Sequence, residues 1–238
     1  MMANNLPSHE VEIYSVEEKV SKDFSTYDAL IIGTPTHHAE PAEFLINYID
    51  GLPIHRLKIP TFVFNTKGLA SCHTNRILAK KLLSKNLVTI YEADYIAPAS
   101  DGILFLPDVP PVNRFFKFEK EIEAKVLRDC TQFLEQVELQ KDKVSAKLPS
   151  VRLSTLINFP NKFLSQFIKV SIHLHEEDCI KCNLCMNKCP YKAIDKNEEG
   201  FPVVIKPKCT NCYRCIHQCP KQALGIRKNK KHSKLLKY

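Results

Sequence analysis

Residues 179–194 read CIKCNLCMNKCPYKAI and place four cysteines within eleven positions. The same spacing returns in residues 209–224, CTNCYRCIHQCPKQAL, so both segments have the form C-x2-C-x2-C-x3-C-P. The offset of 30 residues holds at every cysteine and also relates Ala193 to Ala223. The two segments therefore form an internal repeat of one small cysteine-rich unit.

This spacing resembles that of bacterial-type ferredoxins, which carry two [4Fe–4S] clusters. In that family the first three cysteines of a segment surround one cluster, and the fourth, which precedes proline, ligates the other cluster. The resemblance implies one cluster on Cys179, Cys182, Cys185 and Cys219, and a second on Cys209, Cys212, Cys215 and Cys189. The segment between the repeats, AIDKNEEGFPVVIKP (193–207), predicts two short strands around a turn at Glu199–Gly200.

The positions between the first three cysteines depart from this resemblance. Ferredoxins of this kind often have glycine there, whereas this chain has Lys181, Asn183, Asn211 and Tyr213. Asparagine tolerates the left-handed backbone conformation, so we expect the loops to form nevertheless.

Two other uses of clustered cysteines fit the pattern less well. Zinc sites usually show two cysteine pairs separated by a longer segment, not a triplet followed by Cys-Pro. A disulfide framework requires an oxidising compartment, and residues 1–16 lack the basic start and apolar core of a secretory signal. No run of about 18 apolar residues is present either, so no transmembrane segment is expected. We therefore expect a cytoplasmic protein whose clustered cysteines bind iron and sulfide.

The net charge of +8 is partly concentrated in residues 221–238, which contain seven Lys or Arg and no Asp or Glu. A basic tail suits a solvated chain end, an anionic membrane surface or an acidic partner. No interleaved aromatic residues and no nucleic-acid-binding motif accompany it, so nucleic-acid binding is not expected. The apolar stretch 153–175 has two interpretations, packing between domains or peripheral contact with a membrane surface.

Residues 1–140 show a different pattern, in which apolar runs alternate with amphipathic segments. Continuous apolar runs predict buried strands, and apolar residues at steps of three or four predict helices. The predicted strands are residues 11–16, 27–35, 60–66 and 87–97, and the predicted helices are residues 42–52, 75–85 and 113–140. This alternation predicts a parallel sheet with helices on both faces.

The chain as a whole resembles fusion ferredoxins, in which an N-terminal flavodoxin-like domain precedes two [4Fe–4S] clusters. The resemblance rests on YDALIIGTPTHHAEPAEFL (27–45), PTFVFNTKGLASC (60–72) and the two cysteine segments, in that order. It implies an FMN site at the carboxyl ends of the strands, where such sheets bind ligands. Carried over by position, it implies a first ring-side loop of Thr34, Pro35, Thr36 and His37 and a second of Asn65, Thr66, Lys67 and Gly68.

The N-terminus departs from this family. Flavodoxin-like domains open with a strand and a phosphate-binding loop at a helix N-terminus, and this sequence has neither before residue 11. The missing strand would be the central one of the family's 2-1-3-4-5 order. Its absence would leave residues 11–16 without a neighbour and open one edge of the strand at 27–35. Either upstream residues belong to the protein, or the domain is truncated and binds FMN poorly.

These observations predict an incomplete α/β flavodoxin-like parallel sheet followed by a small α+β ferredoxin domain with two [4Fe–4S] clusters. The expected boundaries are residues 1–145 for the first domain, 146–171 for a linker, 172–228 for the second domain and 229–238 for a basic tail. The expected function is electron transfer with a redox partner protein. Two alternatives stay open: a flavin-dependent reductase fed by its clusters, and a docking subunit of a larger redox complex that binds no flavin.

Four further side chains, two cysteines and two histidines, have simple interpretations. Cys130 falls on the apolar face of its predicted helix, so we expect it in the core. Cys72 lies in a loop without a nearby base and is expected to be an ordinary small side chain. The neighbouring His37 and His38 point apart when extended, so a flavin-side or surface role is favoured over a metal pair.

Overall fold

The computed structural model describes residues 9–17, 23–68, 70–106, 117–140, 144–150 and 170–226, together with positions 2, 6, 109–110 and 112–113. The chain divides into two compact units. The first comprises Met1–Ala97 and Phe118–Lys162, and the second comprises Pro98–Lys117 and Phe163–Tyr238. The expected linker core at 151–169 and the basic tail at 229–238 lie outside the described residues.

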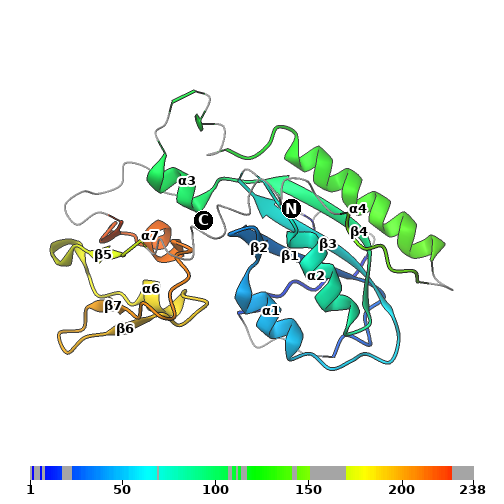
Figure 1. The fold of residues 1–238 in the computed structure, drawn as a ribbon, viewed down its shortest axis with the longest axis horizontal. Coiled ribbons are helices and arrows are strands. Elements are labelled where there is room, and N and C mark those ends of the chain that lie inside the picture. The colour runs from blue at the N-terminus through cyan, green and yellow to red at the C-terminus, as the bar shows by residue number, and fades with distance from the viewer. Residues whose placement is uncertain are drawn as a thin grey trace. The chain divides into compact units, whose positions relative to one another are not determined.

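The first unit is built on a four-stranded mixed sheet with the order β2-β1-β3-β4 (Figure 1). β1, β3 and β4 run parallel, and the short β2 pairs antiparallel with the end of β1. The strands are β1 (Leu30–His37), β2 (Glu40–Pro41), β3 (Ile59–Lys67) and β4 (Leu87–Ile96). The predicted parallel strands at 27–35, 60–66 and 87–97 are therefore confirmed, and only the two-residue β2 was not foreseen.

Helices cover both faces of this sheet, as the alternating pattern predicted. They are α1 (Glu43–Asp50) and α2 (Thr74–Leu83) on one face and α4 (Ile122–Leu139) on the other. Because successive strand residues point to opposite faces, Val63 of β3 packs in the cluster with α1 and α2, and its neighbour Phe62 packs with α4. Cys130 of α4 is fully buried in that second cluster, so its predicted core position is confirmed.

The last helix of this unit is shorter than predicted. The apolar pattern indicated a helix over 113–140, but α4 begins at Ile122, and Phe118 is 61% exposed. The segment before α4 is attached to the end of β4, because the backbone N–H of Glu119 donates to the Ile96 carbonyl and the Glu119 carboxylate accepts the Ile96 N–H, each at 3.1 Å. These bonds hold the backbone in a non-helical conformation that a 3.6-residue pattern cannot reveal.

The outer edge of β1 carries no further strand within the described residues, since β2 pairs only with Thr36 and His37. The predicted strand at 11–16 is wrong, because this segment forms no strand. A hollow with mainly apolar walls runs along the β1 edge and is lined by β1, α1, α4 and residues 9–17. Strand propensity is not sufficient for a strand, since a strand requires a neighbour to which its backbone can hydrogen bond.

No helix of the described residues is long and apolar enough to cross a membrane.

Two tyrosines of β4 make the first unit sensitive to alkaline pH. The hydroxyls of Tyr91 and Tyr95 donate to the Asp129 carboxylate at 3.1 and 2.8 Å. Burial and this carboxylate raise the pKa of Tyr91 to about 12 and also raise the pKa of Tyr95. A tyrosine whose pKa is raised in the folded state contributes its full stabilisation of the fold at pH values below the pKa of tyrosine in the unfolded chain, about 10. This stabilisation is lost as the pH rises from that value towards the folded-state pKa.

We therefore expect the free energy of unfolding to fall between about pH 10 and pH 12. Tyr95→Phe should flatten this fall, because the substituted ring cannot ionise. Urea unfolding followed by circular dichroism at several pH values measures the fall in the wild type and in the variant. Equal slopes for wild type and Tyr95→Phe would contradict this assignment.

The second unit contains the two cysteine segments and a small amount of regular structure. Its elements are β5 (His173–Leu174), η3 (Glu176–Asp178), α6 (Leu184–Asn187), β6 (Ile194–Lys196), β7 (Pro202–Val204), α7 (Arg214–Gln218) and β8 (Leu224–Gly225). β6 and β7 form the predicted hairpin, and Gly200 in its turn has a φ of 84°. β5 pairs antiparallel with β8, so the residues just before the first cysteine segment lie beside the end of the second.

Helix α3 (Ser100–Phe105) was not predicted, and it belongs to the second unit although it follows β4 in the sequence. Leu104 is buried in a cluster with Tyr213, Ile216 and Leu224. The ring of Phe105 meets the ring of Tyr213 edge to face at 5.6 Å. Helix α3 therefore covers α7, which lies in the second cysteine segment.

Candidate iron–sulfur centre

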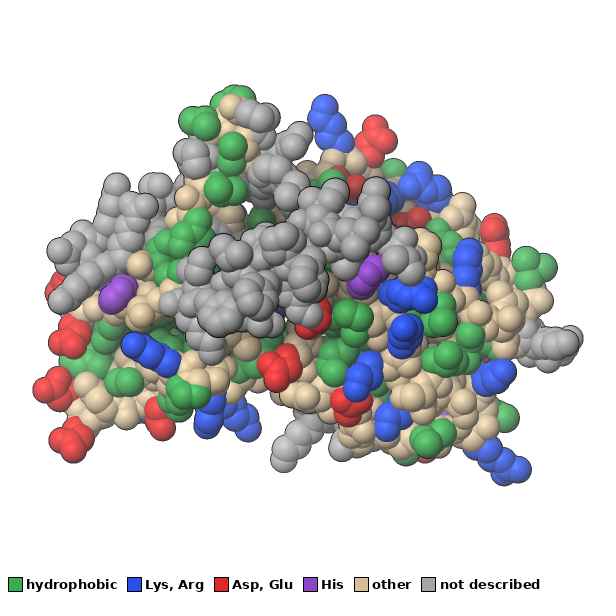
Figure 2. Space-filling model, viewed as in Figure 1, with side chains coloured by type: hydrophobic (Ala, Val, Ile, Leu, Met, Phe, Trp, Pro, Cys, Tyr) green, Lys and Arg blue, Asp and Glu red, His purple; other side chains and the backbone are tan. Residues whose placement is uncertain are grey.

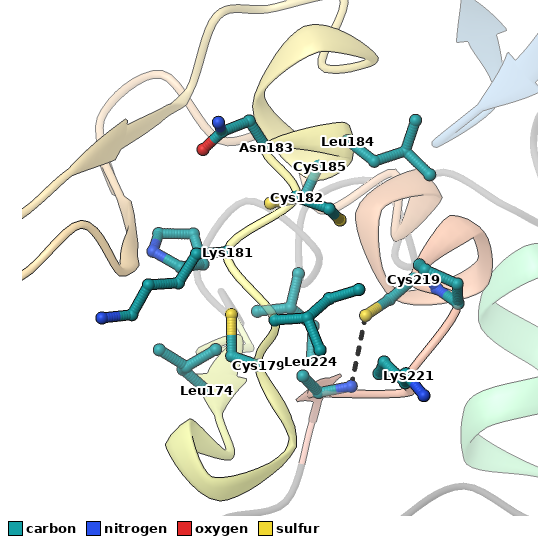
Figure 3. Close-up of a pocket in the computed structure, with 14 residues that line it drawn as sticks. Leu174, Cys179, Lys181, Cys182, Asn183, Leu184, Cys185, Cys219, Lys221 and Leu224 are labelled. Atoms are coloured by element: carbon teal, nitrogen blue, oxygen red, sulfur yellow. Dashed lines mark hydrogen bonds between the residues drawn. The ribbon is translucent and has the colours of Figure 1, made fainter.

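Four cysteines from the two repeats line one hollow of the second unit. Three come from the first segment and its helix α6, and the fourth follows α7 (Figure 3). They are Cys179, Cys182, Cys185 and Cys219. The remaining wall is mainly apolar and includes Leu174 and Leu224, and Lys181, Asn183 and Lys221 also line the hollow.

A second hollow of the same kind is lined by the other four cysteines of the repeats. These are Cys209, Cys212, Cys215 and Cys189. Each hollow thus combines three cysteines of one segment with the fourth cysteine of the other segment.

None of the ten cysteines of the chain is in a disulfide. Among the described residues, no three His, Cys, Asp or Glu side chains converge closely enough to hold a single metal ion.

The backbone of the two cysteine loops repeats as closely as their sequence. Four of the eight residues between the first three cysteines of the two segments, Lys181, Asn183, Asn211 and Tyr213, have φ between 54° and 61°. The loops therefore adopt the left-handed conformation that glycine favours, as expected for asparagine. This conformation costs residues other than glycine and asparagine roughly 1–2 kcal/mol each. Lys181 and Tyr213 adopt it where the loops curve around the hollows.

Backbone N–H groups also reach the sulfurs in a repeated way. The N–H of Ala193 donates to Sγ of Cys189 at 3.3 Å, and the N–H of Ala223 donates to Sγ of Cys219 at 3.2 Å. Each bond thus holds the sulfur of the fourth cysteine in its segment. Hydrogen bonds to sulfur are among the features by which a protein sets the potential of an iron–sulfur cluster.

Three of the eight thiols that line the hollows have a raised pKa, which disfavours their ionisation without iron. Burial raises the pKa of Cys185 to about 11 and raises the pKa of Cys212 and Cys215. Iron ligation requires thiolates, so binding must release the protons of these thiols and is disfavoured at low pH.

The two loops of the first unit that the resemblance implied as ring-side do meet at one edge of the sheet. Thr34–Asn65 and Pro35–Thr66 are paired neighbours in β1 and β3. The hydroxyl of Thr36 donates to Asn65 Oδ1 at 3.1 Å, which ties the two loops together.

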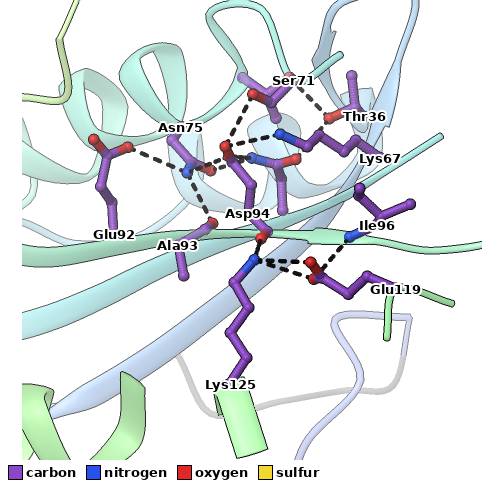
Figure 4. A network of polar contacts seen from close by, with 12 residues as sticks. Thr36, Lys67, Ser71, Asn75, Glu92, Ala93, Asp94, Ile96, Glu119 and Lys125 are labelled. Atoms are coloured by element: carbon purple, nitrogen blue, oxygen red, sulfur yellow. Dashed lines mark hydrogen bonds and ion pairs between the residues drawn. The ribbon is translucent and has the colours of Figure 1, made fainter. Parts of the chain in front are cut away.

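Most polar side chains of these loops are bound inside the protein. Thr34 is buried, and its hydroxyl accepts the N–H of Ala42 at 3.0 Å ahead of α1. Asn65 is fully buried and donates to Asp94 at 2.6 Å, and Lys67 pairs with the same carboxylate at 3.1 Å (Figure 4). The polar groups of Thr34, Thr36, Asn65 and Lys67 are therefore engaged within the protein rather than presented to a flavin ring. Pro35, His37, Thr66 and Gly68 are the other implied residues, and none of them is fully buried.

Sequence reasoning missed the centre of this polar network. Asp94 accepts hydrogen bonds from Asn65, Lys67, Ser71 and Asn75. A signal was available, because a carboxylate within the apolar strand LVTIYEADYI requires partners if it is buried. Cys72, predicted to be an ordinary small side chain, is buried beside this edge with a φ of 46°.

Comparison with known proteins supports the assignment of the C-terminal part. Residues 178–224 match the family described as the 4Fe-4S dicluster domain. The match includes both cysteine segments and the hairpin between them. No curated protein matches the chain. Residues 178–224 are thus similar to ferredoxin-type domains that bind iron–sulfur clusters.

Proposed function

We propose that this protein transfers single electrons through two [4Fe–4S] clusters. The first is held by Cys179, Cys182, Cys185 and Cys219, and the second by Cys209, Cys212, Cys215 and Cys189. The observation that carries the proposal is the pair of hollows, each lined by four cysteines from both repeats. Their mainly apolar walls and backbone N–H···S bonds suit clusters whose potential is set by the protein.

Reconstitution tests this proposal directly. The purified chain, loaded anaerobically with iron and sulfide, should hold about eight iron and eight sulfide per chain, as two cubane clusters require. Reduction with dithionite should produce the electron paramagnetic resonance spectrum of two interacting reduced clusters, and reoxidation should remove it. Incorporation of zinc alone, or iron without acid-labile sulfide, would disprove the proposal.

The role of the first unit is the second part of the proposal. The resemblance implies FMN at the edge formed by β1 and β3, but four of the eight implied side chains are bound within the protein. We therefore assign no electron-transfer step to a flavin and propose that this unit serves as a docking domain. The flavin content of the purified protein decides this point. One FMN per chain would support the family's FMN site instead, and turnover of NAD(P)H would then favour the reductase.

A further inference from the structure

The two cysteine loops, which are equivalent in sequence, differ in how the rest of the unit covers them. In the second loop Tyr213 is 6% exposed, because Phe105 and Leu104 of α3 pack against it. The equivalent residue of the first loop, Asn183, is partly exposed, and no helix of the described residues covers it as α3 covers Tyr213. Ile180 of the first loop is 57% exposed, and Cys182 is exposed whereas its equivalent Cys212 is not.

The charges next to the two loops differ as well. The first loop follows Glu176, Glu177 and Asp178, whereas the equivalent residues before the second loop are Lys206, Pro207 and Lys208. Glu176 and Glu177 are exposed. The repeat has thus placed acidic residues before the open loop and basic residues before the covered one.

The β6–β7 hairpin adds to the acidic side. Lys181 of the open loop donates to the carbonyl oxygen of Glu199 at 2.7 Å, and its ammonium lies 4.0 Å from the centre of the Phe201 ring. These contacts hold the hairpin turn, with exposed Glu198 and Glu199, beside the loop. Figure 2 shows Asp and Glu side chains along the edge of the molecule that carries this hairpin.

From these differences we infer that the Cys179–Cys185 loop is the docking face for a redox partner protein, and that this partner presents a basic surface. This inference rests on the proposed function. Ile180 supplies an apolar contact at the centre, and the carboxylates of Glu176, Glu177, Glu198 and Glu199 form an acidic rim. Electron transfer slows steeply with distance, so exchange is fastest where a ligand sulfur reaches the surface, and here that is Cys182. Complementary charge raises the rate of encounter more than the affinity.

Cytochrome c, a basic haem protein, is a suitable probe. One electron leaves the reduced protein and converts the ferric haem to ferrous haem, with no proton transferred. The double variant Glu176→Gln/Glu177→Gln should lower the second-order rate about threefold to tenfold at about 0.01 M salt. At about 1 M salt the difference should vanish, because the Debye length is then only about 3 Å.

Glu123→Gln/Glu135→Gln is the matched control, because it changes the net charge equally at exposed positions of α4. It should alter the rate by less than about twofold. Ile180→Lys should also lower the rate. An equal loss in the control variant, or an unchanged rate in Glu176→Gln/Glu177→Gln, would overturn the inference.

A readout independent of electron transfer uses carbodiimide cross-linking of the loaded protein to cytochrome c. The cross-linked carboxylates, identified by mass spectrometry, should be Glu176, Glu177, Glu198 or Glu199. Cross-links confined to α4 or to other acidic residues would overturn the inference. Iron and sulfide content distinguishes a failure of this inference from a failure of the proposed function. Full clusters with the wrong docking face refute only this inference, whereas missing clusters refute the proposed function.

Discussion

The double variant Cys189→Ala/Cys209→Ala should retain one complete cluster, whereas Cys182→Ala/Cys189→Ala should lose both. The first pair removes two sulfurs from the same hollow, and the second pair removes one sulfur from each. We therefore expect about four iron per chain in the first variant and few in the second, because a [4Fe–4S] cluster is held by four cysteines. The two variants each remove two thiols, so they control for each other.

The expected pattern is specific to the crossed arrangement. If each sequence segment held its own cluster, Cys182→Ala/Cys189→Ala would keep four iron and Cys189→Ala/Cys209→Ala would lose nearly all. Iron and sulfide analysis measures the content. Electron paramagnetic resonance adds a second test, because a single remaining reduced cluster gives an isolated spectrum without coupling to a neighbour. The reverse outcome would contradict the ligand sets proposed above.

The cysteine loops and the hairpin of the second unit could be predicted from sequence because their information is local. Three cysteines at steps of three residues fix one short loop, and the repeat at an offset of 30 residues fixes the second. The hairpin followed from a glycine turn between apolar runs, and Gly200 does adopt a positive φ. The crossed ligand sets came from resemblance to ferredoxins, and the hollows that combine both segments arise from the packing of the two repeats.

Features that depend on distant partners could not be predicted in the same way. Helix α3 is six residues long, and its partner Tyr213 lies more than 100 residues further along the chain. An isolated helix of this length is unstable, so no local pattern marks it. The prediction of a strand at residues 11–16 was wrong for a related reason. Their strand propensity is high, but no strand of the described residues pairs with them.

The edge of the first sheet shows a third kind of limit. The resemblance placed the loops Thr34–His37 and Asn65–Gly68 together at the carboxyl ends of the strands, and the structure does join them through Thr36 and Asn65. Which side chains face outward depends on Asp94, which attracts the donors of Asn65 and Lys67 inward. A carboxylate in the following strand therefore decides how much of the predicted site is available to a ligand.

Asp94→Ala should destabilise the first unit by about 3–5 kcal/mol, as expected when one partner of a largely buried ion pair is removed. Asp94 and Lys67 are 11% and 18% exposed, so the Lys67 ammonium would be left without its carboxylate in a poorly solvated place. Asn65 and Asn75, both buried, would each lose a hydrogen-bond acceptor. A loss of this size approaches the whole stability of many domains.

Two comparisons make this prediction specific. Asp50→Ala breaks an ion pair with Lys81 whose side chains are 49% and 42% exposed, so it should cost about 1 kcal/mol or less. Asp94→Ala/Lys67→Met should recover part of the loss, because it removes the unpaired ammonium as well as the carboxylate. Urea unfolding followed by circular dichroism gives the free energies, and the visible absorption of the clusters reports the second unit separately. A loss in Asp94→Ala no larger than in Asp50→Ala would show that the network does not hold the sheet edge together.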